Sequence, residues 1–310
     1  MNRLHVFTLM LICLCGTSVF AQQDPMYTQY IANPVTINPA IAGTRMTTNL
    51  TAVFRKQWLG MEGAPTTATI SYQTALNKNK VGIGANLVHD RIGPVIQTGL
   101  YLDYAYHLTV DQEKNRKLSL GLMGGFNYYT FDLLSLRSDV PDDDILHEEV
   151  NSRFLPNFGF GLYYYTPKFI LGVSLPKLLR NSLSNKENTL TAEDKEERHL
   201  FLMTGYKLEL SEKIDFKPSI IGRFVNGAPA SLDLNGTFVY NDRIWLGALY
   251  RVGVSWGIMA GWQISKQLFL AYSYDFNHKL IRGSSFGSHE ISISYDLKWN
   301  QEKISSPRYF

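Results

Sequence analysis

The feature that most constrains this chain is an alternation of apolar and polar residues with a period of two, which recurs along most of its 310 residues. In the segment 267–277, for example, Leu270, Tyr272 and Tyr274 alternate with the small or polar residues Ala271, Ser273 and Asp275. A period of two is the pattern of a β-strand with one apolar and one polar face. No comparable segment shows the 3.6-residue period of an amphipathic helix. We therefore predict an all-β protein.

The alternating segments number about fourteen, an even number that suits a barrel whose two chain ends lie on one side of a membrane. They span residues 46–57, 65–75, 80–89, 95–108, 116–131, 153–165, 168–175, 198–210, 213–225, 229–240, 243–251, 254–264, 267–277 and 286–299. The alternation from Ile244 to Trp262 is unbroken. A strand of about 19 residues would be about 63 Å long, far beyond the roughly 30 Å hydrocarbon layer of a membrane. We therefore predict a turn at Arg251-Val252-Gly253.

The connections between these segments differ in length according to their order along the chain. Even-numbered connections, such as 76–79 and 241–242, are mostly tight and polar, whereas the two longest, 132–152 and 176–197, are odd-numbered. Short periplasmic turns and long outer loops are typical of outer-membrane barrels. Two soluble all-β domains are the alternative, against which the lack of a linker rich in Pro, Ser or Gly argues. We predict a single transmembrane antiparallel up-and-down β-barrel over residues 46–299.

Residues 1–21 have the features of a secretory signal peptide: an early basic residue, an apolar stretch of about ten residues and a small-residue end at Ala21. The apolar stretch is too short to span a membrane. Cys13 and Cys15 would leave with this segment, so the mature chain would hold no disulfide and no thiolate metal site. Loss of Arg3 lowers the formal charge from +3 to about +2 (29 basic minus 27 acidic residues). This charge argues against a nucleic-acid partner.

Residues 22–45 precede the first predicted strand and differ from it in composition. The part from Asp24 to Gly43 contains three prolines and two Asn-Pro steps. Proline lacks an amide donor and biases the preceding residue to extended shapes, so we expect an ordered segment outside the strand ladder. Tyr27 and Tyr30 favour a buried position over a flexible leader. We expect this segment to face the periplasm, plugging the lumen or lying across its mouth, and residues 300–310 to form a periplasmic tail.

No residue pattern in the chain indicates catalysis, a cofactor or a metal. Gly82-Ile83-Gly84 is a Gly-x-Gly pair on a strand without the third glycine and following helix of a phosphate site. The seven His residues form no His-x-x-x-His pair, and the acidic run at 142–144 matches no calcium-loop motif. There is no Gly-x-Ser-x-Gly motif, although a membrane hydrolase stays an alternative. We predict a protein that is not an enzyme and has no cofactor.

Several groups of residues resemble the PorP/SprF family of type IX secretion system outer-membrane proteins. They are Gln23 to Tyr30, Asn33-Pro34, Ile37 to Ala40, Phe54 to Gly60, Gly63-Ala64-Pro65, Val81 to Gly84, Asp90 to Pro94, Leu102 to Tyr106 and Ser288 to Tyr295. The resemblance implies a non-enzymatic barrel in the outer membrane of a Bacteroidota-type envelope. It further implies a role in type IX secretion and gliding motility. Implied partners are the lipid bilayer, periplasmic components of the machinery, and exported proteins with type B C-terminal sorting domains, such as adhesins, which the barrel helps to secrete or attach to the surface.

A diffusion channel or a transporter of hydrophobic solutes is the other function class, because fourteen strands leave room for a lumen. Conductance of the purified barrel would separate the two classes.

The candidate partner-binding residues lie in the proline-rich segment and near the outer ends of the first and third strands. They are Asp24, Pro25, Tyr27, Tyr30, Asn33, Pro34, Asn38, Pro39, Arg55, Gln57, Trp58, Asp90 and Arg91. Arg55, Gln57 and Trp58 either grip a cargo segment or have structural roles, with Arg55 paired inside the barrel and Trp58 at the lipid interface. For Asp90 and Arg91 the structural alternative is an internal ion pair.

Overall fold

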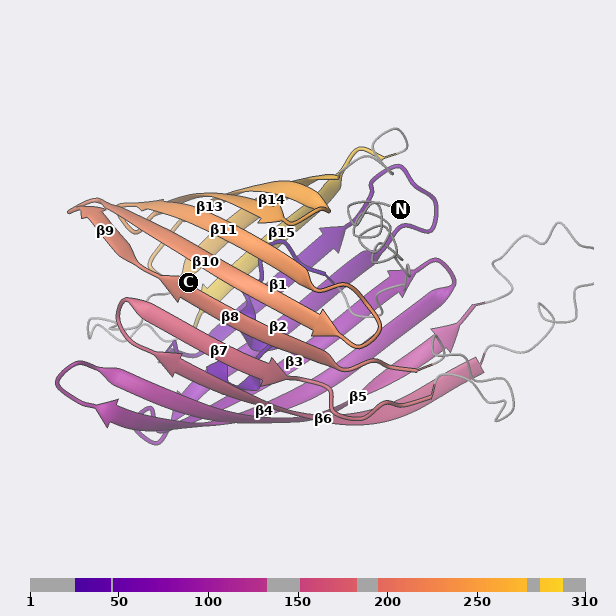
Figure 1. Ribbon diagram of the computed structural model, residues 1–310, viewed down its shortest axis with the longest axis horizontal. Coiled ribbons are helices and arrows are strands. Elements are labelled where there is room, and N and C mark those ends of the chain that lie inside the picture. The colour runs from indigo at the N-terminus through magenta and orange to yellow at the C-terminus, as the bar shows by residue number, and fades with distance from the viewer. Residues whose placement is uncertain (1–25, 46, 133–150, 183–194, 278–284, 298–310) are drawn as a thin grey trace, which may run out of the picture.

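The computed structural model describes residues 26–45, 47–132, 151–182, 195–277 and 285–297. The strands in these ranges form one antiparallel sheet closed on itself (Figure 1). The strands are β1 (Asn49–Lys56), β2 (Thr66–Leu76), β3 (Val81–Ile92), β4 (Val95–Asp111), β5 (Arg116–Phe131), β6 (Asn151–Tyr165), β7 (Phe169–Leu175), β8 (His199–Tyr206), β9 (Leu208–Ser211), β10 (Ile214–Val225), β11 (Ser231–Tyr240), β12 (Ile244–Arg251), β13 (Ser255–Gln263), β14 (Leu268–Asn277) and β15 (Ser288–Asp296). The signal peptide, Asp24, Pro25, the acidic run and the C-terminal tail fall outside the described residues.

The first and last strands close the barrel. β1 pairs with β15 in register from Asn49 opposite Asp296 to Lys56 opposite His289, and the other strands pair with their neighbours in chain order. β8 and β9 both pair with β10 and are separated by Lys207 alone, so they form one interrupted strand. The fifteen strands therefore occupy fourteen positions in the wall. This confirms the predicted up-and-down barrel of about fourteen strands.

The long alternating segment 243–264 forms two strands joined by a turn, as its length predicts. β12 ends at Arg251 and β13 begins at Ser255, with Gly253 at a φ of 73° and Val254 N donating to Arg251 O over 3.0 Å. The predicted turn at 251–253 is confirmed.

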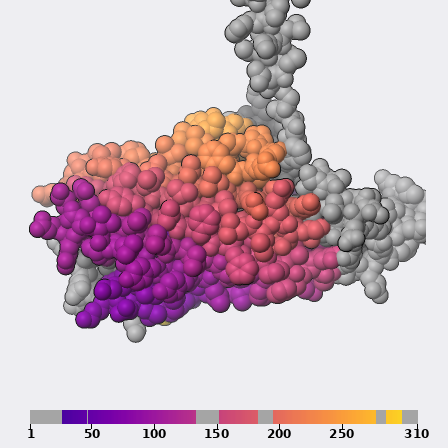
Figure 2. Space-filling view, turned by 60° about the horizontal axis from the view of Figure 1, so that its bottom comes forward, coloured from indigo at the N-terminus to yellow at the C-terminus, as the bar shows by residue number. Residues whose placement is uncertain are grey.

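The barrel wall is apolar outside and polar inside. On β1, Leu50 and Phe54 point outward and are 41% and 52% exposed, whereas Thr51 and Arg55 point inward and are at most 2% exposed. The same alternation runs along most of the other strands, whose outward side chains are large and apolar. In Figure 2 the side chains of the described residues cover the outer face without a break from the indigo to the orange parts of the chain. An apolar outer band around a polar interior is what a lipid environment requires of a barrel.

The two ends of the barrel differ in their connections. At the turn end the strands are joined by tight connections, such as 77–80 and 241–243. At the loop end lie the longer ones, including 57–65, 132–150 and 176–198. In outer-membrane barrels the turn end faces the periplasm and the loop end faces the cell exterior. None of the helices in the described ranges is long and apolar enough to cross a membrane.

Residues 26–45 form a plug inside the barrel. They contain two short 3₁₀ helices, η1 (Pro34–Thr36) and η2 (Pro39–Ile41), and nearly all of their residues are buried. The plug begins at the loop end, where Thr28 contacts Arg55 of β1, and reaches the turn end, where Gly43 N donates to Gln73 of β2. The predicted packing is confirmed, but the expectation that the whole segment faces the periplasm is wrong, because its first residues bond to the loop-end parts of the strands.

Candidate functional site

The prolines and asparagines of the plug build its local structure. Pro39 opens η2, and Asn38 caps it by accepting a hydrogen bond from Ala40 N over 3.0 Å. Proline is favoured at the first position of a helix because its missing N–H would have no partner there. Asn38 Nδ2 also donates to Leu162 O of β6 over 3.1 Å. The two Asn-Pro steps thus turn the chain and attach it to the wall without adding a strand to the sheet.

Glycines in the wall let the plug backbone come close. A Cβ on Gly121 of β5 would lie 2.1 Å from Ala40 N, and one on Gly82 of β3 would lie 1.8 Å from Ala42 O. Side-chain atoms cannot occupy such positions without moving the plug, so only glycine permits this approach. The Gly-x-Gly pair at 82–84 therefore serves close packing inside the barrel and not a phosphate site.

We expect Gly121→Ala to destabilise the folded barrel by about 1–3 kcal/mol, because the added methyl group overpacks the contact with Ala40. Gly124→Ala on the same strand is the matched control, since its Cβ would meet nothing closer than a Phe158 ring atom at 3.8 Å. Urea unfolding of the two purified variants measures the difference. Equal midpoints would contradict the close packing of plug and wall.

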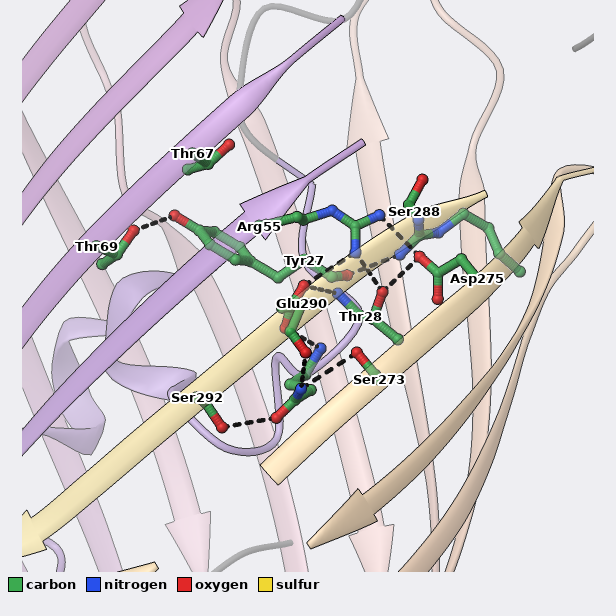
Figure 3. A network of polar contacts seen from close by, with 12 residues as sticks. Tyr27, Thr28, Arg55, Thr67, Thr69, Ser273, Asp275, Ser288, Glu290 and Ser292 are labelled. Carbon is green, nitrogen blue, oxygen red and sulfur yellow. Dashed lines mark hydrogen bonds and ion pairs between the residues drawn. The ribbon is translucent and has the colours of Figure 1, made fainter. Parts of the chain in front are cut away.

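A buried ion-pair cluster holds the loop end of the plug (Figure 3). Arg55 donates from Nη2 to Asp275 Oδ2 over 2.8 Å and from Nη1 to Glu290 Oε2 over 3.0 Å. Thr28 lies between them: its hydroxyl donates to Asp275 Oδ2 over 2.5 Å, and Arg55 Nη1 donates to that hydroxyl over 2.5 Å. We call Arg55, Asp275 and Glu290 the Arg55 cluster. It joins β1, β14 and β15 to the plug.

The plug backbone contributes to the charge balance of this cluster. The cluster contains one cation and two carboxylates. Glu290, which is fully buried, accepts hydrogen bonds from Thr28 N and Gln29 N, each over 2.8 Å and each at a different carboxylate oxygen. Two N–H donors to one buried carboxylate partly replace the missing second cation. The geometry is that of a site that grips two consecutive peptide N–H groups of a chain passing through the lumen.

Further contacts extend this grip on both sides. Tyr27 O accepts from Arg251 Nη2 over 2.9 Å, and Arg251 also makes a two-point ion pair with Asp233. The Tyr27 hydroxyl bonds to Thr69 of β2 over 2.6 Å. The Gln29 side chain donates to Ser273 over 3.1 Å and accepts from Ser292 over 2.7 Å. These bonds tie residues 27–29 directly to four strands, which are β2, β12, β14 and β15, and through Arg251 to β11.

The structure brings together most of the residues singled out in the sequence. Tyr30 packs between Tyr27 and Phe201, with ring centroids 5.5 and 6.4 Å away, and Asn33 Nδ2 donates to Ser71 over 2.8 Å. Pro34, Asn38 and Pro39 lie deeper in the plug. Arg55 makes the internal ion pairs that its structural alternative required.

Gln57 and Trp58 begin the first loop at the loop end. Gln57 N donates to Pro65 O over 2.9 Å and Trp58 N to Ser288 Oγ over 3.3 Å. Trp58 has a φ of 45°, which is uncommon for a bulky residue and marks a constrained turn.

Asp90 and Arg91 do not form the internal ion pair that the sequence suggested. Asp90 points into the barrel, is 2% exposed and accepts from Thr67 Oγ1 over 2.5 Å. Arg91 is exposed and donates to Gly93 O over 3.5 Å. Neighbouring residues of a strand point to opposite faces, so the two side chains are separated by the wall.

The sequence did not reveal a second lumenal attachment, made by the connection between β7 and β8. We call its described residues 176–182 and 195–198 the strap. Glu196 of the strap is buried and accepts from Asn127 Nδ2 over 2.6 Å, Tyr129 OH over 3.0 Å and Asn157 Nδ2 over 3.2 Å. Asn127 and Asn157 occupy inward positions of β5 and β6. Their place in the alternation is the one sequence feature that could have identified them as partners of a lumenal segment.

Comparison with known proteins identifies the family. The model of the type IX secretion system membrane protein PorP/SprF matches residues 19–295. The chain belongs to this family. The match covers the plug as well as the strands of this PorP/SprF barrel. A search of the curated proteins found no match.

Solved structures similar to this PorP/SprF protein are outer-membrane barrels. The CymD monoaromatic hydrocarbon channel aligns with a TM-score of 0.51 at 12% identity, covering 91% of this chain and 96% of that one. Omp33 of Acinetobacter baumannii aligns with a TM-score of 0.46 at 8% identity, covering 82% of this chain and 100% of that one. At such identities the likeness shows the fold alone. Within the described residues, no group of three or more His, Cys, Asp or Glu side chains is placed to hold a metal ion.

Proposed function

We propose that this outer-membrane component of the type IX secretion machinery supports the secretion or surface attachment of exported proteins with type B C-terminal sorting domains, such as adhesins. The family match over residues 19–295 carries the proposal. Gliding motility is the cellular process in which such adhesins act. In this proposal the protein has no enzymatic role and lies in a Bacteroidota-type envelope. Residues 1–21 act as a signal peptide, and residues 300–310 form a periplasmic tail.

The proposed partners would bind at opposite ends of the barrel. An exported protein would meet the loop end, where Gln57, Trp58 and the first residues of the plug lie. Periplasmic components of the machinery would meet the turn end, where the plug enters β1 and the connections are short. This division differs from the one based on sequence, because the start of the plug belongs with the exterior and only its end with the periplasm.

A diffusion channel is less consistent with the lumen. The plug and the strap both occupy it, and both are attached by buried hydrogen bonds to several strands. The hydrocarbon channel that resembles this chain shares its fold at 12% identity, which gives no argument for a shared solute.

Photocrosslinking in native outer membranes tests the proposal. A photoreactive amino acid would replace Gln57 at the loop end or Lys78 at the turn end, each in the full chain. We expect position 57 to capture a large exported protein with a type B sorting domain and position 78 to capture periplasmic type IX components. Capture of neither class, together with an unchanged set of secreted proteins after gene deletion, would refute the proposed function.

A further inference from the structure

A cavity of about 70 Å³ lies in the lumen between the plug and the wall. Its walls are largely apolar and aromatic and include Tyr27, Ile37, Val88, Tyr101 and Phe201. A water molecule needs roughly 10–15 Å³ of such space, so the cavity has room for about five water-sized groups. That volume suits a short aliphatic chain with a polar head.

One carboxylate in this cavity is poorly compensated. Asp103 of β4 lines the cavity and is 5% exposed. Asn86 Nδ2 donates to its Oδ2 over 2.6 Å, and in the described part of the chain this is the one hydrogen bond to the carboxylate, with no cation paired to it. Asn86 Oδ1, next to it, is buried with no partner there. A buried acceptor that lacks a hydrogen-bond donor lowers the stability of the fold unless a ligand supplies the donor.

A glycine in the wall makes room for this carboxylate itself. Gly84 of β3 lies directly opposite Asp103 in the strand register, and a Cβ there would come within 3.0 Å of Asp103 Oδ2. Gly84 and Asp103 belong to segments that resemble the PorP/SprF family. Neither residue contacts the Arg55 cluster, so attachment of the plug there does not explain their presence. Lys177 of the strap also lines the cavity and has an interaction partner of its own. The cavity is therefore lined by a carboxylate with one hydrogen bond in the described part of the chain and by one amide oxygen without a partner there, among largely apolar walls.

We propose that this cavity binds one ammonium or guanidinium group carried on an apolar stem. Asp103 and Asn86 Oδ1 accept its N–H donors, and the stem packs against Val88 and Met123. The aromatic side chains of Tyr101 and Phe201 also line the cavity, and aromatic rings attract cations. A lysine or arginine side chain of an exported polypeptide and a free small amine share this chemistry. Assigning the cation to an exported polypeptide rests on the proposed function, whereas the binding of a cation in the cavity does not depend on it.

Thiol labelling of the purified barrel tests the cavity directly. Val88→Cys is made in a chain in which Cys13 and Cys15, the only cysteines of the sequence, are replaced by alanine. We expect the new thiol to react about tenfold or more faster with the cationic aminoethyl methanethiosulfonate than with the anionic sulfonatoethyl reagent, because the Asp103 carboxylate attracts a cation and repels an anion. Adding Asp103→Asn should remove this preference. Asp111→Asn, on the same strand but outside the cavity, should preserve it.

The source of the cation is assigned by protection from labelling. Protection by acetyl-Gly-Lys-Gly-amide assigns a polypeptide side chain, and protection by n-butylamine alone assigns a free amine. The proposal is overturned if neither compound protects, if the thiol is unreactive to both reagents, or if Asp103→Asn leaves the preference unchanged. Because these measurements use purified protein without secretion, their failure is distinguishable from failure of the proposed function.

Discussion

Replacing Arg55 by methionine is expected to destabilise the folded barrel by about 3–5 kcal/mol, because the change leaves two buried carboxylates without their shared cation. Arg55, Asp275 and Glu290 have side chains that are at most 3% exposed, so water cannot take the place of the guanidinium. The loss also removes the hydrogen bond from Arg55 to Thr28, which should loosen the plug. Urea unfolding of the purified barrel in lipid vesicles measures the effect.

An exposed ion pair of the same barrel provides the matched control for this prediction. Lys168 and Glu209 are 3.0 Å apart, with side chains about half exposed (53% and 50%). Lys168→Met should cost less than about 1 kcal/mol, as exposed pairs contribute little. The double variant Arg55→Met/Glu290→Gln should regain part of the lost stability, since one stranded charge is removed. Equal effects of Arg55→Met and Lys168→Met would show that the Arg55 cluster does not stabilise the fold.

Deletion of residues 24–43 is expected to convert a poorly conducting barrel into an open pore. The single-channel conductance should rise about tenfold or more. The deleted residues include most of the plug. Their removal leaves a lumen that the strap still occupies in part and whose wall carries Ser, Thr, Asn and charged side chains that water solvates. Planar-bilayer recordings of the purified full chain and of the deletion variant measure the change.

Two controls keep this measurement interpretable. The deletion variant must retain the heat-dependent shift in gel mobility of a folded barrel. A synthetic peptide of residues 24–43, added to the bilayer chamber, should reduce the conductance again. A folded deletion variant that conducts no better than the full chain would contradict the role of these residues as a plug.

The strands of this fold were accessible from the sequence because their signal is local. Alternation places each apolar side chain on the lipid face regardless of what lies across the barrel, and it located even the turn after Arg251. The same rule separates Asp90 from Arg91, which the suggestion of an ion pair overlooked. The buried position of the proline-rich segment was also predictable from Tyr27, Tyr30 and its Asn-Pro steps.

The contacts inside the lumen were not accessible in this way. Thr28 and Glu290 are 262 positions apart, and Asn127 and Glu196 are 69 apart. Nothing local distinguishes an inward Glu or Asn that binds the plug or strap from one that faces water. The direction of the plug depends on these distant pairs, so its start was assigned to the wrong end of the barrel. Arg55 was singled out as a candidate, but its partners Asp275 and Glu290 were not.

The central claim is that residues 26–45 run through a closed barrel from the loop end to the turn end, and cysteine labelling on intact cells tests it most directly. Met26→Cys would be compared with Ala230→Cys at the loop end and Lys80→Cys at the turn end, both exposed positions. The account predicts that a membrane-impermeant maleimide labels positions 26 and 230 on intact cells, and position 80 only after the outer membrane is permeabilised. Labelling of position 26 only after permeabilisation would contradict it.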